Sequence, residues 1–245
     1  YVSMSSAVMA TGMFRSFGSN TIMVFKFKAM SFGNISPEEW KRKPITLENA
    51  RAIAERCPSV LHVSPYLIPG FFRGVNKARY KNNDLYQIDL GGTEEGYTST
   101  GVVMSEGRFF TDTENRRRLP VVVIGADVRS GLFQGASAVG KWIEVNGHQF
   151  EVVGAMERPA ASMPGMQDMR VLLPYFTMRK MFPNAREHML IVVTYPDKLA
   201  AAEDEVRTVL RIERRVPHDK PDDFWMSTAE QMLEDAGIEL PPEYA

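Results

Sequence analysis

Hydrophobic and polar residues recur in two similar β-α-β patterns, one near each end of the chain. The first pattern predicts a strand at Thr21–Phe27, a helix over about Thr46–Arg56 and a strand over about Val60–Leu67. Thr46 is a favourable N-cap, and Pro58 prevents the helix from continuing. The apolar positions of the helix lie on one side, so we expect this side to pack on a sheet.

The second pattern lies in the last quarter of the chain. It predicts a strand at Met189–Tyr195, a helix over about Asp197–Ile212 with Asp197 as its N-cap, and a short strand near Phe224–Met226. Two β-α-β units can join into one antiparallel sheet with both helices on the same face, which is the split-βαβ plan.

The residues between the two patterns are rich in short strands and turn residues. The expected strands lie near Gly70–Tyr80, Leu85–Leu90, Pro120–Ile124, Trp142–Val153 and Arg170–Leu173, and short helices are expected at Ala126–Phe133 and Tyr175–Met181. We therefore predict an α+β fold, with a split-βαβ (ferredoxin-like) lobe and an inserted β-rich lobe. The α/β lobe would combine residues 20–81 and 187–245, the insertion would span 82–186, and a stem helix would occupy 1–19.

Three further segments have weaker patterns. The stretch Arg158–Met169 carries two prolines and a glycine, and Met30–Lys43 carries Gly33 and Pro37, so both are expected to be irregular loops. Ser227 or Thr228 could cap a helix that runs through Ala236.

One segment imitates a nucleotide-binding loop. Residues Gly135–Lys141 match the first seven positions of a P-loop, but Trp142 stands where a magnesium-binding Ser or Thr is required. A P-loop must lead into a helix, whereas Ile143 and Val145 alternate with polar residues and Asn146-Gly147 follows. Asn-Gly between alternating segments is typical of a β-hairpin whose two turn residues have positive φ. The segment is interpreted as a structural hairpin.

An ordered series of short motifs resembles a known family. The motifs are Gly18-Ser-Asn-Thr-Ile22, Thr46-Leu-Glu-Asn-Ala50, Glu106-Gly-Arg-Phe-Phe110, Val121-Val-Val-Ile-Gly125-Ala-Asp127, Leu132-Phe133, Val139-Gly-Lys141, Val145-Asn-Gly147, Phe150-Glu-Val-Val-Gly154, and Gln167-Asp168 to Leu173-Pro174. Their order resembles the extracytoplasmic core domain of MacB-type ABC transporter permeases. The resemblance covers the chain from about Gly18 to Glu230, and it rests on the series rather than on any one motif.

The resemblance implies a non-catalytic domain that couples ATP hydrolysis in the cytoplasm to export on the outer side of the inner membrane. It implies a second permease subunit, a cytoplasmic ATPase domain or subunit, and in Gram-negative members a periplasmic adaptor and an outer-membrane channel. Members of the family have an α/β lobe and an inserted β-rich lobe, in agreement with the pattern above. The stem helix over residues 1–19 would then rise from a membrane span in a longer protein.

Composition narrows the alternatives. The 245 residues are 44% hydrophobic and carry a net charge of −1, so the chain can bury a large core and has no charge excess to attract nucleic acid. Cys57 is the one cysteine, which excludes an intrachain disulfide and favours a buried structural thiol. The runs Arg116–Arg118 and Arg214-Arg215 are flanked by acidic residues and are interpreted as solvated loops or helix ends.

No residue set predicts catalysis, a cofactor or a metal. The four histidines His62, His148, His188 and His218 lack metal-ligand spacing, and a site formed by His218 with Asp219, Asp222 and Asp223 is disfavoured against a solvated loop. The alternative function is a soluble ligand- or soft-metal-binding protein that uses the Met-rich loop 158–169, because thioethers bind soft ions. Met163, Met166 and Met169 would form that site.

Overall fold

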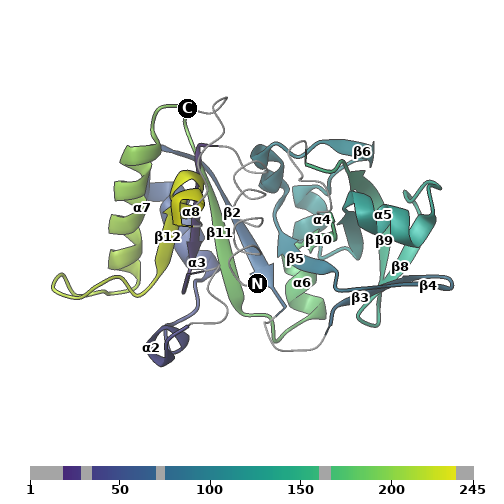
Figure 1. Ribbon diagram of the computed structural model, residues 1–245, viewed down its shortest axis with the longest axis horizontal. Helices are drawn as coiled ribbons and strands as arrows, with labels where there is room; N and C mark the ends of the chain where they lie inside the picture. Colours follow the sequence, from purple (N-terminus) through teal and green to yellow (C-terminus); the bar gives the residue numbers. More distant parts are fainter. Residues whose placement is uncertain (1–18, 29–34, 70–74, 160–166, 236–245) are drawn as a thin grey trace. The chain divides into compact units, whose positions relative to one another are not determined.

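The computed structural model describes residues 19–28, 35–69, 75–159 and 167–235 (Figure 1). The expected stem helix over residues 1–19 and the tip of the Met-rich loop lie outside the described residues, apart from Ser19 in a turn before the first strand. The chain forms two compact units, which comprise residues 1–64, 99–101 and 188–245 (unit 1) and residues 65–98 and 102–187 (unit 2). The fold is of the mixed α/β type, with a mixed sheet and several helices.

Unit 1 combines the two ends of the chain. Its elements are β1 (Thr21–Phe25), α2 (Pro37–Trp40), α3 (Leu47–Arg56), β2 (Val60–Ile68), β11 (Glu187–Thr194), α7 (Leu199–Glu213), β12 (Trp225–Thr228) and α8 (Ala229–Asp235). The strand order is β12-β1-β11-β2, and β1 pairs antiparallel with both β11 and β12. Strands from opposite ends of the sequence are therefore neighbours in this unit (Figure 1).

The core of unit 1 lies between the strands and the pair α3 and α7. Ile22 and Val24 of β1 share this core with Ile53 of α3 and Val206 of α7, and all four are fully buried. The i, i+3, i+4 spacing that predicted both helices places these apolar side chains on one side of each helix. Cys57 is the C-cap residue of α3 and is buried, as expected. Burial is the main reason why the pKa of its thiol is raised to about 11, and the nearby Glu205 carboxylate adds to the increase. The thiol therefore stays protonated and unreactive at neutral pH.

The sequence predicted the N-cap of one helix of unit 1 correctly and that of another wrongly, and it missed a third helix. Thr46 caps α3 through a capping box with Asn49, so this prediction is confirmed. Asp197 was expected to cap α7, and this prediction is wrong: α7 begins after Lys198, Asp197 has a φ of 60°, and no side chain caps the helix. The expected irregular stretch 30–43 contains the helix α2, because Ser36 forms a capping box with Glu39 and Pro37 occupies the first turn.

In the part of unit 2 that the structure describes lie the remaining strands and the helices α4, α5 and α6. Its elements are β3 (Lys77–Tyr80), β4 (Asn83–Tyr86), β5 (Asp89–Thr93), β6 (Met104–Gly107), α4 (Asp112–Arg116), β7 (Val121–Ile124), α5 (Ala126–Phe133), β8 (Trp142–Val145), β9 (His148–Met156), β10 (Arg170–Pro174) and α6 (Tyr175–Met181). From β2 onward the strand order is β2-β5-β10-β7-β9-β8-β3-β4, and β6 pairs with β9. The pairs β5–β10 and β7–β9 are parallel, and the other neighbours for which the register is known are antiparallel.

Several predictions for this region are confirmed. Helices α5 and α6 have the predicted bounds, and β8 and β9 form the expected hairpin with Val145 paired to His148. Asn146 and Gly147 have φ values of 47° and 86°, as a two-residue turn with positive φ at both positions requires. The prediction of a single strand at Leu85–Leu90 is wrong. The chain turns at Gln87, which has a φ of 57°, so these residues are divided between β4 and β5.

Candidate functional site

Five residues of unit 2 hold the two ends of the Met-rich loop, and we call them the loop clamp: Gly125, Asp127, Arg158, Asp168 and Arg170. At the start of the loop, the Arg158 guanidinium donates to Oδ1 of Asp127 at 2.7 Å. Near its end, the backbone N–H of Asp168 donates to Oδ2 of Asp127 at 2.5 Å. A single carboxylate therefore binds both ends of the loop.

The Asp168 carboxylate takes the place of an N-cap side chain at α5. The N-cap residue is Gly125, which has no side chain, and the backbone N–H of Ala126 donates to Oδ2 of Asp168 at 3.1 Å. A Cβ added at Gly125 would lie 2.5 Å from Oδ1 of Asp168, so only glycine permits this approach. A negative charge at a helix N-terminus is stabilised by the free N–H groups and by the helix dipole.

Arg170 balances that charge. Its Nε and Nη2 donate to the two carboxylate oxygens of Asp168 at 2.7 and 2.9 Å, in a bidentate pair whose side chains are 17% and 4% exposed. Burial lowers the pKa of Arg170, but the hydrogen bond that it donates to Asp168 and the nearby Tyr97 raise it by more, so the pKa of Arg170 lies above the ordinary value. Burial raises the pKa of the neighbouring Tyr66 and Tyr97. A buried Arg170–Asp168 ion pair beside phenols of raised pKa can fix a loop, and neither the guanidinium nor the phenols are suited to act as a nucleophile or acid–base group near pH 7.

The segment that imitates a P-loop is bound by a carboxylate. Glu106 accepts hydrogen bonds from the hydroxyl of Ser137 and from the backbone N–H groups of Ala138 and Val139, the latter two at 3.2 and 3.3 Å. Arg129 of α5 pairs with the same carboxylate at 3.1 Å. The N–H groups that a phosphate would need are therefore already occupied, and the next element is strand β8 rather than a helix. Lys141 is exposed to solvent.

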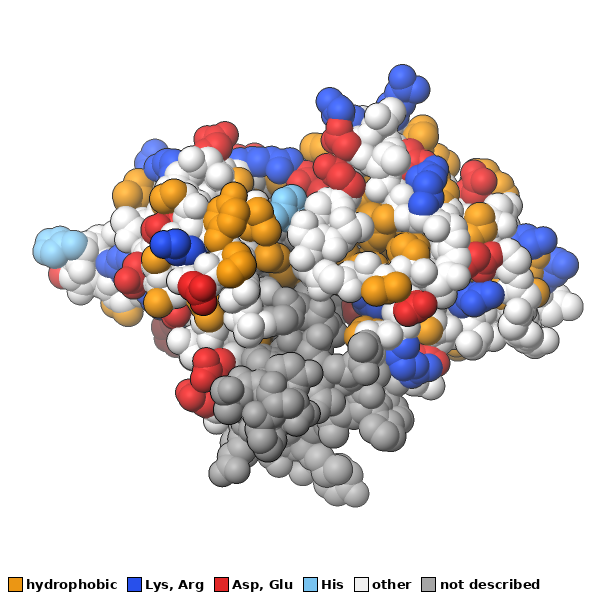
Figure 2. Space-filling view, turned by 90° about the horizontal axis from the view of Figure 1, so that it is seen from above, with side chains coloured by type: hydrophobic (Ala, Val, Ile, Leu, Met, Phe, Trp, Pro, Cys, Tyr) orange, Lys and Arg blue, Asp and Glu red, His pale blue; other side chains and the backbone are white. Residues whose placement is uncertain are grey.

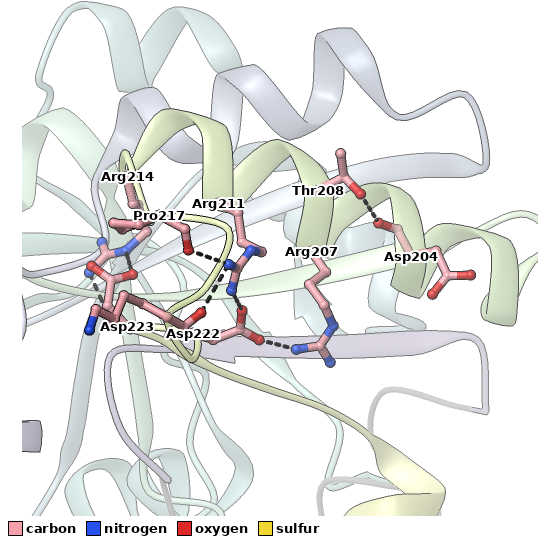
Figure 3. A network of polar contacts seen from close by, with 9 residues as sticks. Asp204, Arg207, Thr208, Arg211, Arg214, Pro217, Asp222 and Asp223 are labelled. Carbon is pink, nitrogen blue, oxygen red and sulfur yellow. Dashed lines mark hydrogen bonds and ion pairs between the residues drawn. The ribbon is translucent and has the colours of Figure 1, made fainter.

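A second polar network lies in unit 1, at the C-terminal end of α7 (Figure 3). Arg207, Arg211 and Arg214 have the spacing i, i+4, i+7 and point toward the loop that follows the helix. Asp222 accepts from Arg207 and, at 2.7 Å, from Arg211. Arg211 also donates to the backbone carbonyl oxygen of Pro217 at 2.7 Å. We call this set, together with Asp223, the arginine network.

Arg214 is the most buried member of the arginine network. Its side chain is 3% exposed and donates to Oδ1 of Asp223 at 2.6 Å. It also donates to the backbone carbonyl oxygens of Lys43 and Pro44, at 2.8 and 3.1 Å. One guanidinium thus joins α7, the loop after it and the segment before α3. The interpretation of Arg214 as part of a solvated run is wrong, whereas Arg215 is exposed as expected.

The arginine network includes two of the acidic residues that follow His218. Asp222 and Asp223 are bound to arginines, and His218 and Asp219 are exposed. Within the described residues, no group of three or more His, Cys, Asp or Glu side chains could hold a metal ion. Met163 and Met166 of the other candidate site lie outside the described residues, and Met169 is partly buried beside the loop clamp.

Comparison with known proteins identifies the family. The profile of the MacB-like periplasmic core domain matches residues 2–209. The chain belongs to this family. The macrolide export ATP-binding/permease protein MacB of Bdellovibrio bacteriovorus is 29% identical over 208 residues, which cover 82% of this chain and 30% of that protein. The pyoverdine export protein PvdT of Pseudomonas entomophila is 26% identical over 180 residues, which cover 71% and 26%. The chain thus spans less than a third of the length of these relatives.

Solved structures share the fold of this MacB-like domain. The periplasmic region of MacB from Actinobacillus actinomycetemcomitans has a TM-score of 0.73 at 18% identity, with 93% of this chain and 97% of that one covered. The extracellular domain of the transporter YknZ from Gram-positive bacteria has a TM-score of 0.62 at 19% identity, with 85% and 100% covered. The family is a domain of transporter permeases rather than a catalytic domain. No helix among the described residues is long and apolar enough to cross a membrane.

The MacB-like motifs mark structural positions in this chain. Gly107 has a φ of 65°, and a Cβ there would lie 2.3 Å from the carbonyl oxygen of Val153. A Cβ added at Gly154 would lie 2.1 Å from the carbonyl oxygen of Arg108, so the backbone has no room for a side chain there. Glu106, Gly125 and Asp168 have the roles described above. The sequence singled out these residues by resemblance, but it did not show that they bind one another.

Proposed function

We propose that this chain is the non-catalytic extracytoplasmic domain of an ABC transporter permease, in which it couples cytoplasmic ATP hydrolysis to export on the outer side of the membrane. The membership of residues 2–209 in the MacB-like periplasmic core domain family carries this proposal. The printed names of the relatives, macrolide and pyoverdine export ATP-binding/permease proteins, support transport as the activity of the parent protein. Those two names differ in the exported compound, so the proposal extends to export and not to one substrate.

The proposed partners follow from the same family. A second permease subunit would form a homodimer in the full protein, a cytoplasmic ATPase domain or subunit would supply the energy, and a periplasmic adaptor and an outer-membrane channel would extend the path. The proposed location is the periplasmic side of the inner membrane. The chain covers only 30% of the MacB of Bdellovibrio bacteriovorus, which leaves room in that relative for an ATPase and membrane spans.

We further propose that unit 1 has the split-βαβ plan and that the β-rich lobe is inserted into it. The antiparallel pairing of β1 with both β11 and β12 supports this plan, as does the shared core of α3 and α7. The proposed crossing lies within β2, between Ser64 and Pro65, rather than near residue 81.

In a domain that couples ATP hydrolysis to export, the loop clamp and the arginine network would provide rigidity. A domain that transmits force needs connections that do not yield, and each of these clusters fixes a loop to the end of a helix by charged hydrogen bonds. Such bonds are shorter and stronger than neutral ones, and burial shields them from screening. Their role here would be rigidity rather than chemistry.

The experiment is performed in the parent permease. A flexible glycine–serine segment inserted between Gly18 and Ser19, just before β1, should leave ATP binding intact but lower export per ATP hydrolysed, because a flexible insertion transmits less force between the domain and the preceding chain. The control is an insertion of equal length at the exposed turn Lys81-Asn82 between β3 and β4. Export that is unchanged by the first insertion would contradict coupling through this connection.

A further inference from the structure

The strand register of unit 2 places a set of polar and aromatic side chains on one face of β4, β3, β8 and β9. Residues that are paired across antiparallel strands have their side chains on the same face, as do residues two positions apart on one strand. Arg79 of β3 is paired with Asp84 on one side and with Glu144 on the other. We call the resulting surface the open sheet face, and its members are Lys77, Arg79, Asp84, Tyr86, Trp142, Glu144, Gln149 and Glu151.

The open sheet face is exposed, whereas the opposite face of the same strands is covered. Val145 is fully buried, and Leu85 of β4 lies beside Gly131 of α5, where an added Cβ would be 3.0 Å from Leu85. Helix α5 therefore packs on the opposite face. On the open sheet face, Tyr86 is 56% exposed, Trp142 is 50% exposed, and the other members are exposed or half-buried.

The two exposed aromatic side chains stand at diagonal corners of the open sheet face. From the row of Arg79, Tyr86 lies two residues away in one direction along the strands and Trp142 two residues away in the other, and β3 runs between their strands. At about 3.4 Å per residue and about 4.8 Å per strand, their backbone positions are roughly 17 Å apart. A ligand that contacts both rings is therefore an extended chain rather than a compact small molecule.

The cations between the two rings are already paired with a carboxylate. Nε and Nη2 of Arg79 donate to the two carboxylate oxygens of Asp84 at 2.6 and 3.0 Å, and Nζ of Lys77 lies 3.2 Å from the same carboxylate. The hydrogen bond from Arg79 holds the pKa of Asp84 below its usual range, so the carboxylate stays ionised. Glu144 and Glu151 add two further carboxylates, and the face has no excess of positive charge.

Two exposed rings with paired polar groups between them suit a neutral sugar chain. A pyranose ring has an apolar C–H face that can stack on an aromatic side chain, and a rim of hydroxyl groups that can bond to the N–H groups and lone pairs an ion pair leaves open. We propose that the open sheet face binds a neutral oligosaccharide chain, with one sugar stacked on Trp142, another on Tyr86, and hydroxyl groups bonded to Arg79 and Asp84. The inference goes beyond the proposed function and does not depend on coupling.

A lipid surface or a charged peptide fits the open sheet face less well. Peripheral membrane binding requires several basic residues on one face, whereas both cations of this face are paired with Asp84. Figure 2 likewise shows acidic and basic side chains interspersed on the face that it views, without a broad basic field. A charged peptide would have to replace the existing ion pairs by new exposed ones, and such an exchange contributes little net free energy.

The test measures binding of a soluble sugar to the full chain by isothermal titration calorimetry. The probe is chitohexaose, a neutral chain of N-acetylglucosamine units, and the disaccharide chitobiose is the short control. Trp142→Ala and Tyr86→Ala each remove one ring of the open sheet face. The matched control is Tyr195→Ala, which removes a ring of unit 1 that is 46% exposed. Circular dichroism verifies that the variants stay folded, and Trp142→Phe retains a ring at the same position.

We expect chitohexaose to bind the unaltered chain and Tyr195→Ala equally, and Trp142→Ala and Tyr86→Ala each about fivefold more weakly. Chitobiose should bind more weakly than chitohexaose, because it cannot reach both rings, and Trp142→Phe should retain more affinity than Trp142→Ala. Absence of binding, equal affinity for the two sugars, or equal losses in the three alanine variants would overturn the inference. Tighter binding of an acidic or basic peptide, lost in Trp142→Ala, would assign the face to a protein partner instead. None of these results bears on coupling, which the insertion in the parent permease tests separately.

Discussion

The loop clamp of unit 2 and the arginine network of unit 1 both fix a loop to the end of a helix, but the first does so at the N-terminus of α5 and the second at the C-terminus of α7. In the loop clamp, the carboxylates of Asp127 and Asp168 lie at the N-terminus of α5. In the arginine network, Arg211 and Arg214 lie at the C-terminus of α7 and bind the loop that follows. Anions are stabilised at helix N-termini and cations at C-termini, so each loop is fixed by the charge that its helix end favours.

The two clusters differ in burial, and this difference predicts their energies. Arg214 is almost fully buried and binds two backbone carbonyl groups as well as Asp223. The bond between Arg158 and Asp127 joins side chains that are 44% and 20% exposed, so water can replace part of it. The arginine network should therefore stabilise unit 1 mainly through Arg214. In the loop clamp, the stabilisation should be divided between the buried pair Arg170–Asp168 and the more exposed pair Arg158–Asp127.

The largest effect is expected for Arg214→Met. The substitution keeps the aliphatic volume but leaves Asp223 and the carbonyl groups of Lys43 and Pro44 without their donor. Unpaired buried polar groups cost about 1–3 kcal/mol each, so we expect a loss of about 3 kcal/mol in the free energy of unfolding. Denaturant titration measures it.

The matched control for this prediction is Arg207→Met. Arg207 binds Asp222 from a side chain that is 43% exposed, and Asp222 keeps its bond to Arg211. A loss below about 1 kcal/mol is expected for such an exposed pair. Equal losses in the two variants would show that burial does not distinguish the members of the network.

Local signals predicted much of the fold. The capping box at Thr46, the Asn146-Gly147 turn and the bounds of α5 and α6 follow from residues adjacent in sequence, and all are confirmed. The prediction failed at Gln87, where a turn forms without Gly, Asn or Pro, and at Asp197, where no side-chain cap exists. At both positions tertiary packing overrides a weak local preference.

The two clusters could not be predicted from the sequence, because their partners are distant. Arg214 and Lys43 are separated by 171 positions, and Asp168 and Ala126 by 42. One signal was present: Arg207, Arg211 and Arg214 share a helix side, and the acidic pair Asp222-Asp223 follows. That spacing predicts a charged helix side, but it does not say that a buried guanidinium binds the segment before α3.

An intermediate effect is expected for Asp168→Asn in the loop clamp. The amide keeps the size of the side chain but loses the charge that Arg170 and the N-terminus of α5 both bind. Since a nearly buried cation then lacks its counter-charge, we expect a loss of about 2 kcal/mol in the free energy of unfolding. Hydrogen exchange at Ala126, read by NMR, should accelerate with it. Arg158→Gln, at the exposed end of the loop clamp, is the control, and an equal effect there would remove the distinction between the two ends.

The smallest effect concerns Glu106 and has a defined pH dependence. Burial raises the pKa of this carboxyl, but the hydrogen bonds from Ser137 and the backbone lower it by more, so its folded-state pKa lies below the unfolded value. A depressed pKa contributes stability that is present above the unfolded pKa of about 4.3 and is lost as the pH falls through the folded-state value. Glu106→Gln removes this contribution at neutral pH. The difference in Tm between the unaltered chain and the variant should therefore be largest at pH 6–7 and shrink as the pH falls from about 4.3 toward 3. Glu114→Gln serves as a comparison, because Arg108 and Thr111 also lower the pKa of Glu114, so its Tm difference should shrink in the same direction. A Tm difference for Glu106→Gln that stays constant from pH 7 to 3 would show that the ionised carboxylate does not brace residues 137–139, and that the segment is held by packing alone.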